Sequence, residues 1–261
     1  MSPQAAREGA AVTVLEAARR LREAVRDYPA RAPAGRVAYI LLPLEYAWEL
    51  HAAYCRRFAP PGHRVEAVLL GMNPGPWGMG QTGVPFGSPD MVRDFLGLRG
   101  RVRQPARMHP RRPVLGLDCP RNEVSGQRLW GAVRDCFGTP EAFFARFYVA
   151  NYCPLLLLAA SGANLTPERA GRALLADCLA AADLHLERVL RALAPRTVIG
   201  VGRWAAARAR AVVERAGLGM RTGMLLHPSP ASPQANRGWR ELALAQLRAL
   251  GHPWPAPASS R

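Results

Sequence analysis

Short apolar runs that alternate with amphipathic helical patterns constrain this chain more than any other feature. Four runs have the length of a buried strand: EAVLLG at 66–71, RFYVAN at 146–151, TVIGVG at 197–202 and MLLH at 224–227. Alternation of strand and helix favours a parallel sheet with right-handed crossovers. The pattern therefore predicts an α/β fold, a single domain with helices on both faces of a parallel sheet.

Amphipathic patterns predict five helices, whose limits follow from capping and helix-breaking residues. Thr166 is a capping residue with Pro167 at the first helical position, and glycines end two other patterns. The predicted helices cover residues 13–27, 45–58, 166–193, 204–217 and 238–251. Residues 1–12 and 253–261 have the Pro, Ala and Ser content of frayed ends, which places the domain at 13–252.

The charge balance indicates the class of partner. All 35 basic residues are arginine, against 19 acidic residues, for a net charge of +16. The absence of lysine excludes a P-loop, a lysine Schiff-base lyase and attachment of pyridoxal phosphate. Arginine in place of lysine is typical of GC-rich coding, but the surplus of positive charge is typical of proteins that bind phosphate-rich partners. We expect nucleic acid rather than a membrane surface.

Cysteine and histidine spacing predicts neither a metal nor a cofactor. The five cysteines never approach C-x-x-C spacing, and the six histidines form no H-E-x-x-H motif. We expect ordinary buried thiols in a reducing compartment. No apolar run approaches the roughly 18 to 20 residues of a membrane span, and no signal-peptide pattern is present. These observations predict a soluble, intracellular protein that does not bind membranes.

The segments that follow each predicted strand carry the candidate functional residues, because ligands bind at the carboxyl ends of parallel strands. The loop at 71–87, GMNPGPWGMGQTGVPFG, is rich in turn-forming residues and could wrap a planar ligand. In it, the Asn73 amide can hold a water molecule and the Phe86 ring can stack on a base. The alternative interpretation is that Asn-Pro-Gly is merely a good turn.

Two further side chains stand at predicted strand ends. Asn151 can present a donor and an acceptor together, which matches the O4 and N3–H edge of uracil. The alternative is an asparagine that satisfies backbone groups. His227 precedes a proline-rich loop that contains Ser229, Gln234 and Asn236. A lone histidine at such a place is more often structural than catalytic.

The GVGRWA motif at 200–205 formally fits the G-x-G-x-x-A pattern of dinucleotide-binding folds. The acidic residue expected about 20 residues later is absent, because no Asp or Glu lies between Glu214 and Glu241. We prefer a strand-to-helix turn whose amides, with Arg203, hold a DNA phosphate. A second basic segment, RVRQPARMHPRRP at 101–113, is either a solvated loop or a phosphate-tracking surface.

Six motifs in one order resemble the single-strand-selective monofunctional uracil-DNA glycosylase family of the uracil-DNA glycosylase superfamily. The resemblance extends from about Tyr46 to Gly251. It rests on GMNPGPWGMGQTGVPFG, HPRRPVLGLDCPRNEVSGQRLWG, NYCPLLLL, SGANLTP, VIGVGR and LLHPSPASPQANRGW. Several long motifs are more specific than any single pattern described above. The resemblance implies a central four-stranded parallel sheet flanked by helices.

The resemblance also implies a role for each matching residue. Asn73 would position the attacking water, and His227 would stabilise negative charge on uracil O2. Asn151 would read the base edge, Phe86 would stack on the base, and the backbone of Met72 would contact it. Stricter uracil enzymes place a bulky ring at the position of Gly75, so that glycine would leave room for substituents at C5.

The loop after His227 resembles the wedge that fills the gap left by a flipped nucleotide. We define the wedge loop as residues 228–237, and the DNA contacts expected from it are Ser229, Pro230, Ala231, Ser232, Pro233, Gln234, Asn236 and Arg237. The sequence departs from well-known members at three positions, with Ala231 in place of arginine, Trp77 in place of phenylalanine and Tyr152 in place of histidine. Arg237 and the prolines remain available to hold the strand apart.

The function that the resemblance implies is hydrolysis of the glycosidic bond of uracil and 5-substituted uracils, such as 5-hydroxymethyluracil, in single- and double-stranded DNA. This reaction leaves an abasic site and initiates base excision repair. It needs no cofactor, and we expect a monomer. The location would be cytoplasmic and nucleoid-associated in a bacterium, or nuclear in a eukaryote. Two alternatives remain: a DNA module that binds damage without excising it, and a nucleotide-dependent enzyme that uses GVGRWA.

Overall fold

A four-stranded parallel sheet forms the centre of the molecule. The structure is a computed structural model that describes residues 12–31 and 33–257. The sheet has the order β3-β2-β6-β7 and consists of β2 (Ala67–Gly71), β3 (Phe147–Asn151), β6 (Thr197–Val201) and β7 (Arg221–Leu225). The expected α/β architecture with a four-stranded parallel sheet is therefore confirmed.

The fourth strand lies earlier in the chain than the sequence predicts. The apolar run suggested 224–227, but β7 begins at Arg221 and ends at Leu225. As an edge strand, β7 pairs with β6 alone, and its first residues are exposed or half-buried. They therefore carry no apolar signal. His227 consequently lies two residues beyond the strand, in the loop that follows it.

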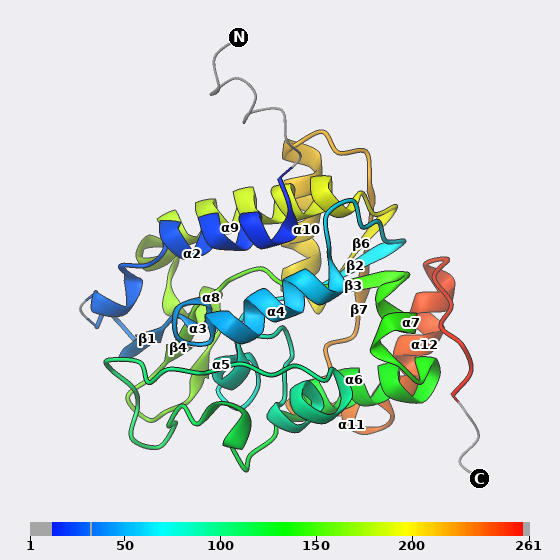
Figure 1. The fold of residues 1–261 in the computed structure, drawn as a ribbon. Coiled ribbons are helices and arrows are strands. Elements are labelled where there is room, and N and C mark those ends of the chain that lie inside the picture. The colour runs from blue at the N-terminus through cyan, green and yellow to red at the C-terminus, as the bar shows by residue number, and fades with distance from the viewer. Residues whose placement is uncertain (1–11, 32, 258–261) are drawn as a thin grey trace.

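Helices cover both faces of the sheet, as the sequence predicts. The connection from β2 to β3 leads toward the β3 edge of the sheet, whereas the connections from β3 to β6 and from β6 to β7 lead toward the β7 edge. Right-handed crossovers therefore place α6 (Val124–Phe137) and α7 (Pro140–Phe144) opposite α9 (Arg172–Leu193) and α10 (Arg203–Arg215). In Figure 1, α9 and α10 lie above and to the left of the sheet, and α6, α7 and α12 (Trp239–Ala249) lie below and to the right.

The five predicted helices are present, two of them interrupted. The helix expected at 45–58 is divided at Ala47 into α3 (Pro43–Tyr46) and α4 (Trp48–Phe58). The one expected at 166–193 is divided into α8 (Pro167–Ala170) and α9 by Gly171, whose φ of 98° no helix accommodates. The first helix, α2, spans Val14–Ala24. Short helical elements complete the set: Tyr28–Ala30, α5 (Met79–Thr82), Met91–Phe95, Gly116–Asp118 and α11 (Pro233–Asn236).

A small antiparallel sheet stands beside the main one, and the sequence did not predict it. It has the order β1-β4-β5, with β1 (Tyr39–Leu41), β4 (Leu156–Leu158) and β5 (Asn164–Leu165). The motif NYCPLLLL, which begins at the end of the second predicted strand, therefore also contains β4. This sheet brings β5 against the loop that follows β2, where Leu165 accepts a hydrogen bond from Asn73.

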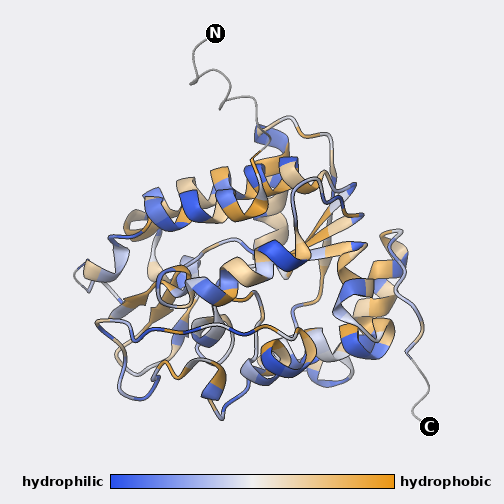
Figure 2. Cartoon of the chain, viewed as in Figure 1, coloured by the Kyte–Doolittle hydropathy of each residue, from blue (hydrophilic) through white to orange (hydrophobic). Residues whose placement is uncertain are grey.

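The core is continuous across the sheet and its helices. Figure 2 shows apolar strands at the centre and helices with alternating apolar and polar turns around them. Trp254 is 7% exposed and packs edge-on against Phe137 and Phe143, so the exclusion of 253–261 from the core is wrong at this residue. Residues 1–11 of the predicted N-terminal end lie outside the described residues. All five cysteines are free and buried.

Candidate active site

The carboxyl ends of β2, β3 and β7 open into one cavity of about 400 Å³. The residues predicted to hold the base and the water all line it, although they come from three separate segments. They are Met72, Asn73, Gly75, Phe86, Asn151 and His227, and the wedge-loop residues Ser229 and Pro230 join them. A cavity with convergent polar groups at this edge of a parallel sheet is the usual form of a ligand site.

Hydrogen bonds from the amide nitrogen fix the Asn73 side chain. Its Nδ2 donates to the carbonyl oxygens of Leu165 (3.2 Å) and Pro74 (3.3 Å). Asn164 in turn donates through Nδ2 to Pro74 O (3.2 Å), so β5 supports this turn twice. Both bonds of Asn73 use its amide nitrogen, which leaves Oδ1 to accept from a water molecule. Sequence reasoning missed Asn164 and Leu165, although SGANLTP lies in a matching motif.

His227 is neutral and has a defined tautomer. The Ser229 N–H donates to His227 Nδ1 (3.1 Å), so Nδ1 carries no proton and Nε2 carries one. Burial lowers the pKa of His227 to about 4. Near neutral pH this side chain therefore presents an uncharged N–H donor to the cavity that it lines.

Phe86, which lines the cavity, occupies a strained backbone conformation. Its φ of 53° lies in the left-handed region, which costs a non-glycine residue about 1 kcal/mol or more. Two glycines make room for it, since a Cβ at Gly71 would lie 2.6 Å from the Phe86 ring and one at Gly126 would collide with the Phe86 carbonyl oxygen. The ring centroids of Phe86 and His227 are 6.0 Å apart. Surrounding contacts therefore fix this ring before any ligand binds.

Asn151 has a buried polar atom without a partner. Its Nδ2 lies 3.0 Å from Met79 Sδ, while Oδ1 has no hydrogen-bond partner within the described part of the chain. The register of β2 and β3 pairs Asn151 with Gly71, so its amide lies at the same end of the sheet as the Asn73 loop. A buried acceptor without a donor is costly and often marks a ligand site.

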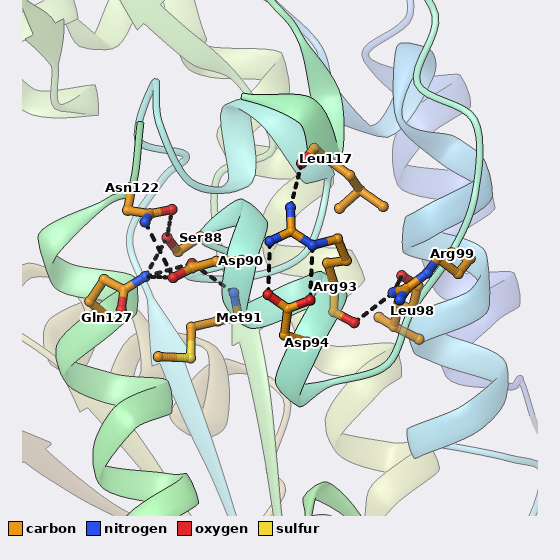
Figure 3. Close-up of polar contacts among 10 residues, drawn as sticks. All are labelled: Ser88, Asp90, Met91, Arg93, Asp94, Leu98, Arg99, Leu117, Asn122 and Gln127. Carbon is orange, nitrogen blue, oxygen red and sulfur yellow. Dashed lines mark hydrogen bonds and ion pairs between the residues drawn. The ribbon is translucent and has the colours of Figure 1, made fainter. Parts of the chain in front are cut away.

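A polar network fastens the segment after Phe86 to the start of α6. Figure 3 shows Gln127 donating to Ser88 and Asp90, and Ser88 donating to Asn122 Oδ1 (3.0 Å). Asn122 closes the network by donating through Nδ2 to Asp90 (3.2 Å). The network holds two segments of the cavity wall together, one that contains Phe86 and one that contains Glu123.

Glu123 occupies the space beside Gly75. A Cβ on residue 75 would collide with Oε2 of Glu123 and lie 2.5 Å from its carboxyl carbon. The Trp77 N–H donates to the same Oε2 (3.2 Å). Burial raises the pKa of Glu123, and the Trp77 hydrogen bond and the charge of Arg112 oppose that shift. Sequence reasoning missed Glu123, and the signal for it was an isolated carboxylate between Asp118 and Asp135 within a matching motif.

The wedge loop is anchored to α6 by an arginine. Arg128 donates to the carbonyl oxygens of Pro228 (3.1 Å) and Ser229 (3.4 Å) and to Asn236 Oδ1 (2.9 Å). Asn236 also donates to Pro230 O (2.9 Å). Ser232 caps α11, and Ala231 and Pro233 are exposed. These hydrogen bonds and the Ser232 cap therefore hold the loop in its conformation. Arg128 is an anchor that sequence reasoning did not identify.

Of the expected DNA contacts only Ser229 and Pro230 line the cavity, and three of the others line separate hollows. Gln234 and Arg237 line a separate hollow beside α12, and Arg203 lines another with Arg210 beside β7. The glycines of GVGRWA have packing explanations. A Cβ at Gly200 would collide with the backbone of α10, and Gly202 has a φ of 94° and lies against His227. This turn therefore supports His227.

The two remaining sequence departures have different surroundings. Trp77 lines the cavity, and the guanidinium carbons of Arg112 and Arg121 lie 5.1 Å and 4.7 Å from its ring centroid. Tyr152 is buried, and its hydroxyl donates to Asp183, which also binds Arg208 and Arg215. Trp77 is thus part of the site, whereas Tyr152 joins β3 to α9 and α10.

Comparison with known proteins decides the family. The model of the family described as "Uracil DNA glycosylase superfamily" matches residues 59–248. The chain belongs to the uracil DNA glycosylase superfamily. Within it, the chain is 49% identical over 215 residues to the single-strand selective monofunctional uracil DNA glycosylase of Bos taurus. The aligned region covers 82% of this chain and 78% of that protein. The Rattus norvegicus protein of the same name is 48% identical, with coverage of 82% and 77%.

A solved structure shows the same fold at low sequence identity. The crystal structure of wild-type Pedobacter heparinus SMUG2 has a TM-score of 0.61 and 17% identity, and covers 88% of this chain and 97% of that one. The chain is therefore a member of the single-strand selective monofunctional uracil DNA glycosylase family, as its motifs predicted. No helix among the described residues is long and apolar enough to span a membrane, and those residues contain no cluster suited to a metal ion.

Proposed function

We propose that this protein excises uracil and 5-substituted uracils from DNA by hydrolysing the glycosidic bond, which leaves an abasic site. The observation that carries the proposal is a convergence in one cavity, beside the ring of Phe86, of a neutral histidine donor, an anchored asparagine and an amide acceptor that has no partner among the described residues. Family membership and names of the relatives support the same activity.

The arrangement fits a base that has left the helix. Flipping costs a few kcal/mol, least for a mispaired or single-stranded nucleotide. A flipped uracil stacked on Phe86 can donate from N3–H to Asn151 Oδ1 and accept at O4 from Asn151 Nδ2. The backbone N–H of Met72 is our candidate for a further contact. Arg112 and Arg121, which flank Trp77 at the rim, offer charges for phosphates on either side.

Bond cleavage then depends on stabilising charge rather than on a nucleophilic side chain. As the bond to the base breaks, the sugar becomes cationic and uracil O2 gains negative charge. A neutral histidine donor aimed at O2 provides oxyanion-type stabilisation, commonly worth about 3 to 4 kcal/mol. Asn73 Oδ1 holds the water that captures the sugar cation. Without lysine, the chain lacks the usual side-chain amine of glycosylases that also nick DNA.

The test uses end-labelled single- and double-stranded oligonucleotides that contain one uracil, incubated in EDTA and analysed with and without alkali. We expect strand breakage only after alkali. Asn73→Ala and His227→Ala should each lower excision by about two to three orders of magnitude. DNA binding without base release by the unmodified protein would instead indicate a damage-binding module, and near-normal turnover by either variant would refute its assigned role.

A further inference from the structure

The environment of Gly75 carries an inference about substrate choice that rests on the proposed function. A glycine at this position suggests an open space next to the base, yet the carboxylate of Glu123 fills the direction in which a side chain would extend. Glu123 is also the one carboxylate lining the cavity within the described ranges. The group that a large C5 substituent meets is therefore an acceptor of hydrogen bonds and not a void.

The orientation of Asn151 indicates which part of the pyrimidine faces this carboxylate. Its Oδ1 lies beside Gly71 and its Nδ2 beside Met79 Sδ. With N3–H at Oδ1 and O4 at Nδ2, the next ring atom beyond O4 is C5. The ring edge at C5 then faces the turn from Gly75 to Met79, over which Glu123 lies.

We propose that Glu123 is a specificity-determining residue for the substituent at C5 of the flipped base. A 5-hydroxymethyl group can donate its O–H to the carboxylate, and a charge-assisted bond of this kind is stronger than a neutral one. A 5-methyl group offers no donor and displaces water from a partly buried carboxylate. A 5-carboxyl group brings a second negative charge to the same place.

The position of Glu123 is fixed before a substrate arrives. Its backbone carbonyl oxygen accepts from Gln127 (2.9 Å), and its carboxylate accepts from the Trp77 N–H (3.2 Å). The neighbouring Asn122 and Gln127 belong to the network with Ser88 and Asp90 in Figure 3. The carboxylate thus acts as a preorganised acceptor, which loses little freedom when it binds a substituent.

The test measures single-turnover excision from single-stranded oligonucleotides with one uracil, 5-hydroxymethyluracil, 5-carboxyuracil or thymine, each expressed relative to uracil. The unmodified protein should excise 5-carboxyuracil about a hundredfold more slowly than 5-hydroxymethyluracil. This comparison requires no variant. Similar rates on these two bases would overturn the proposal, whereas failure to release uracil at all would refute the proposed function itself.

Variants then assign the effect to the side chain. In Glu123→Gln, the rate on 5-hydroxymethyluracil relative to uracil should fall about tenfold, and the relative rate on 5-carboxyuracil should rise about tenfold. Glu123→Ala should raise the relative rate on thymine. Glu214→Gln, the same change on the exposed surface of α10, should leave every ratio unchanged. If Glu123→Gln retains the unmodified ratios, Glu123 only supports the turn and the proposal is wrong.

Discussion

At the scale of single residues, our proposal makes the Asn151 amide the group that selects the base. Its donor and acceptor match uracil, and its Oδ1 has no partner among the described residues. In Asn151→Asp both oxygens accept, so the amino group of cytosine becomes the better partner. We expect uracil excision to fall by at least about tenfold and cytosine excision to appear. Oligonucleotides with each base measure both rates, and an unchanged ratio of the two would contradict the assignment.

Gly71 is required for the shape of the site although it contacts no substrate in our proposal. A Cβ there would collide with Asn151 Oδ1 and lie 2.6 Å from the Phe86 ring. We expect Gly71→Ala to lower uracil excision by about a hundredfold and the free energy of unfolding by about 1 to 3 kcal/mol.

The matched control for this change is Gly131→Ala in α6, where a Cβ would meet nothing within 4 Å. That variant should keep full activity and gain about 0.5 to 1 kcal/mol of stability. Denaturant unfolding and excision assays compare the two variants. Normal activity in Gly71→Ala would show that Phe86 and Asn151 can move without loss of function.

The residue scale also shows where sequence reasoning ends. Asn73, Phe86, Asn151 and His227 were identifiable as cavity residues because each lies at or after the end of a predicted strand and belongs to a long motif. Glu123 also belongs to a matching motif, but it follows no predicted strand, and its contact with Gly75 lies 48 positions away in the chain. Contacts between distant segments leave no local pattern in a single sequence.

At the scale of elements, α6 supports the wedge loop through Arg128. Its guanidinium bonds to Pro228, Ser229 and Asn236 hold the loop where Ala231 replaces the arginine found in well-known members. Opening a duplex demands more of a wedge than binding a single strand. Arg128→Ala should therefore lower excision from duplex DNA about tenfold more than excision from single-stranded DNA.

Arg134→Ala provides the comparison for this prediction, because Arg134 lies on the same helix and pairs only with the adjacent Asp135 among the described residues. Arg134→Ala should change excision from duplex DNA and excision from single-stranded DNA by the same factor. Steady-state rates on matched single- and double-stranded substrates distinguish the variants. An equal loss on both substrates in Arg128→Ala would mean that the loop does not act as a wedge.

Some elements were missed because their sequences carry only a weak helix or strand pattern, and each weak pattern has a physical cause. Helix α6 contains Gly126 and Gly131, and the first is required by the Phe86 carbonyl oxygen rather than by the helix. Glycine lowers helix propensity, so the pattern was obscured. β7 begins with Arg221 and Thr222 because it is an edge strand, and β4 was hidden in a leucine run with no alternation. Tertiary context decided each case.

At the scale of the whole molecule, buried histidines make stability depend on pH. Burial lowers the pKa of both His51 and His185 to about 4, and these side chains are 7% and 9% exposed. Between about pH 6.5 and pH 4 the unfolded chain binds protons at these sites and the folded chain does not, so stability falls as pH falls. We expect the free energy of unfolding to drop by about 3 to 4 kcal/mol between pH 7 and pH 5, because each of these two groups contributes about 2 kcal/mol over that window.

Urea unfolding at several pH values measures this dependence. In His185→Leu one of these groups is absent. The slope of the free energy of unfolding against pH should therefore decrease, within that window, by the amount that corresponds to about one bound proton. A variant with the slope of the unmodified protein would show that His185 titrates equally in the folded and unfolded states.

The burial of all five cysteines also determines how this molecule can be observed at work. Because all five cysteines are buried in the folded protein, a cysteine introduced in place of the exposed Ala231 would be the one exposed cysteine among the described residues. A fluorophore attached there would sit on the wedge loop, at a site more exposed than any of the five native cysteines. Its emission would follow the insertion of that loop into DNA in real time, separately from the release of the base.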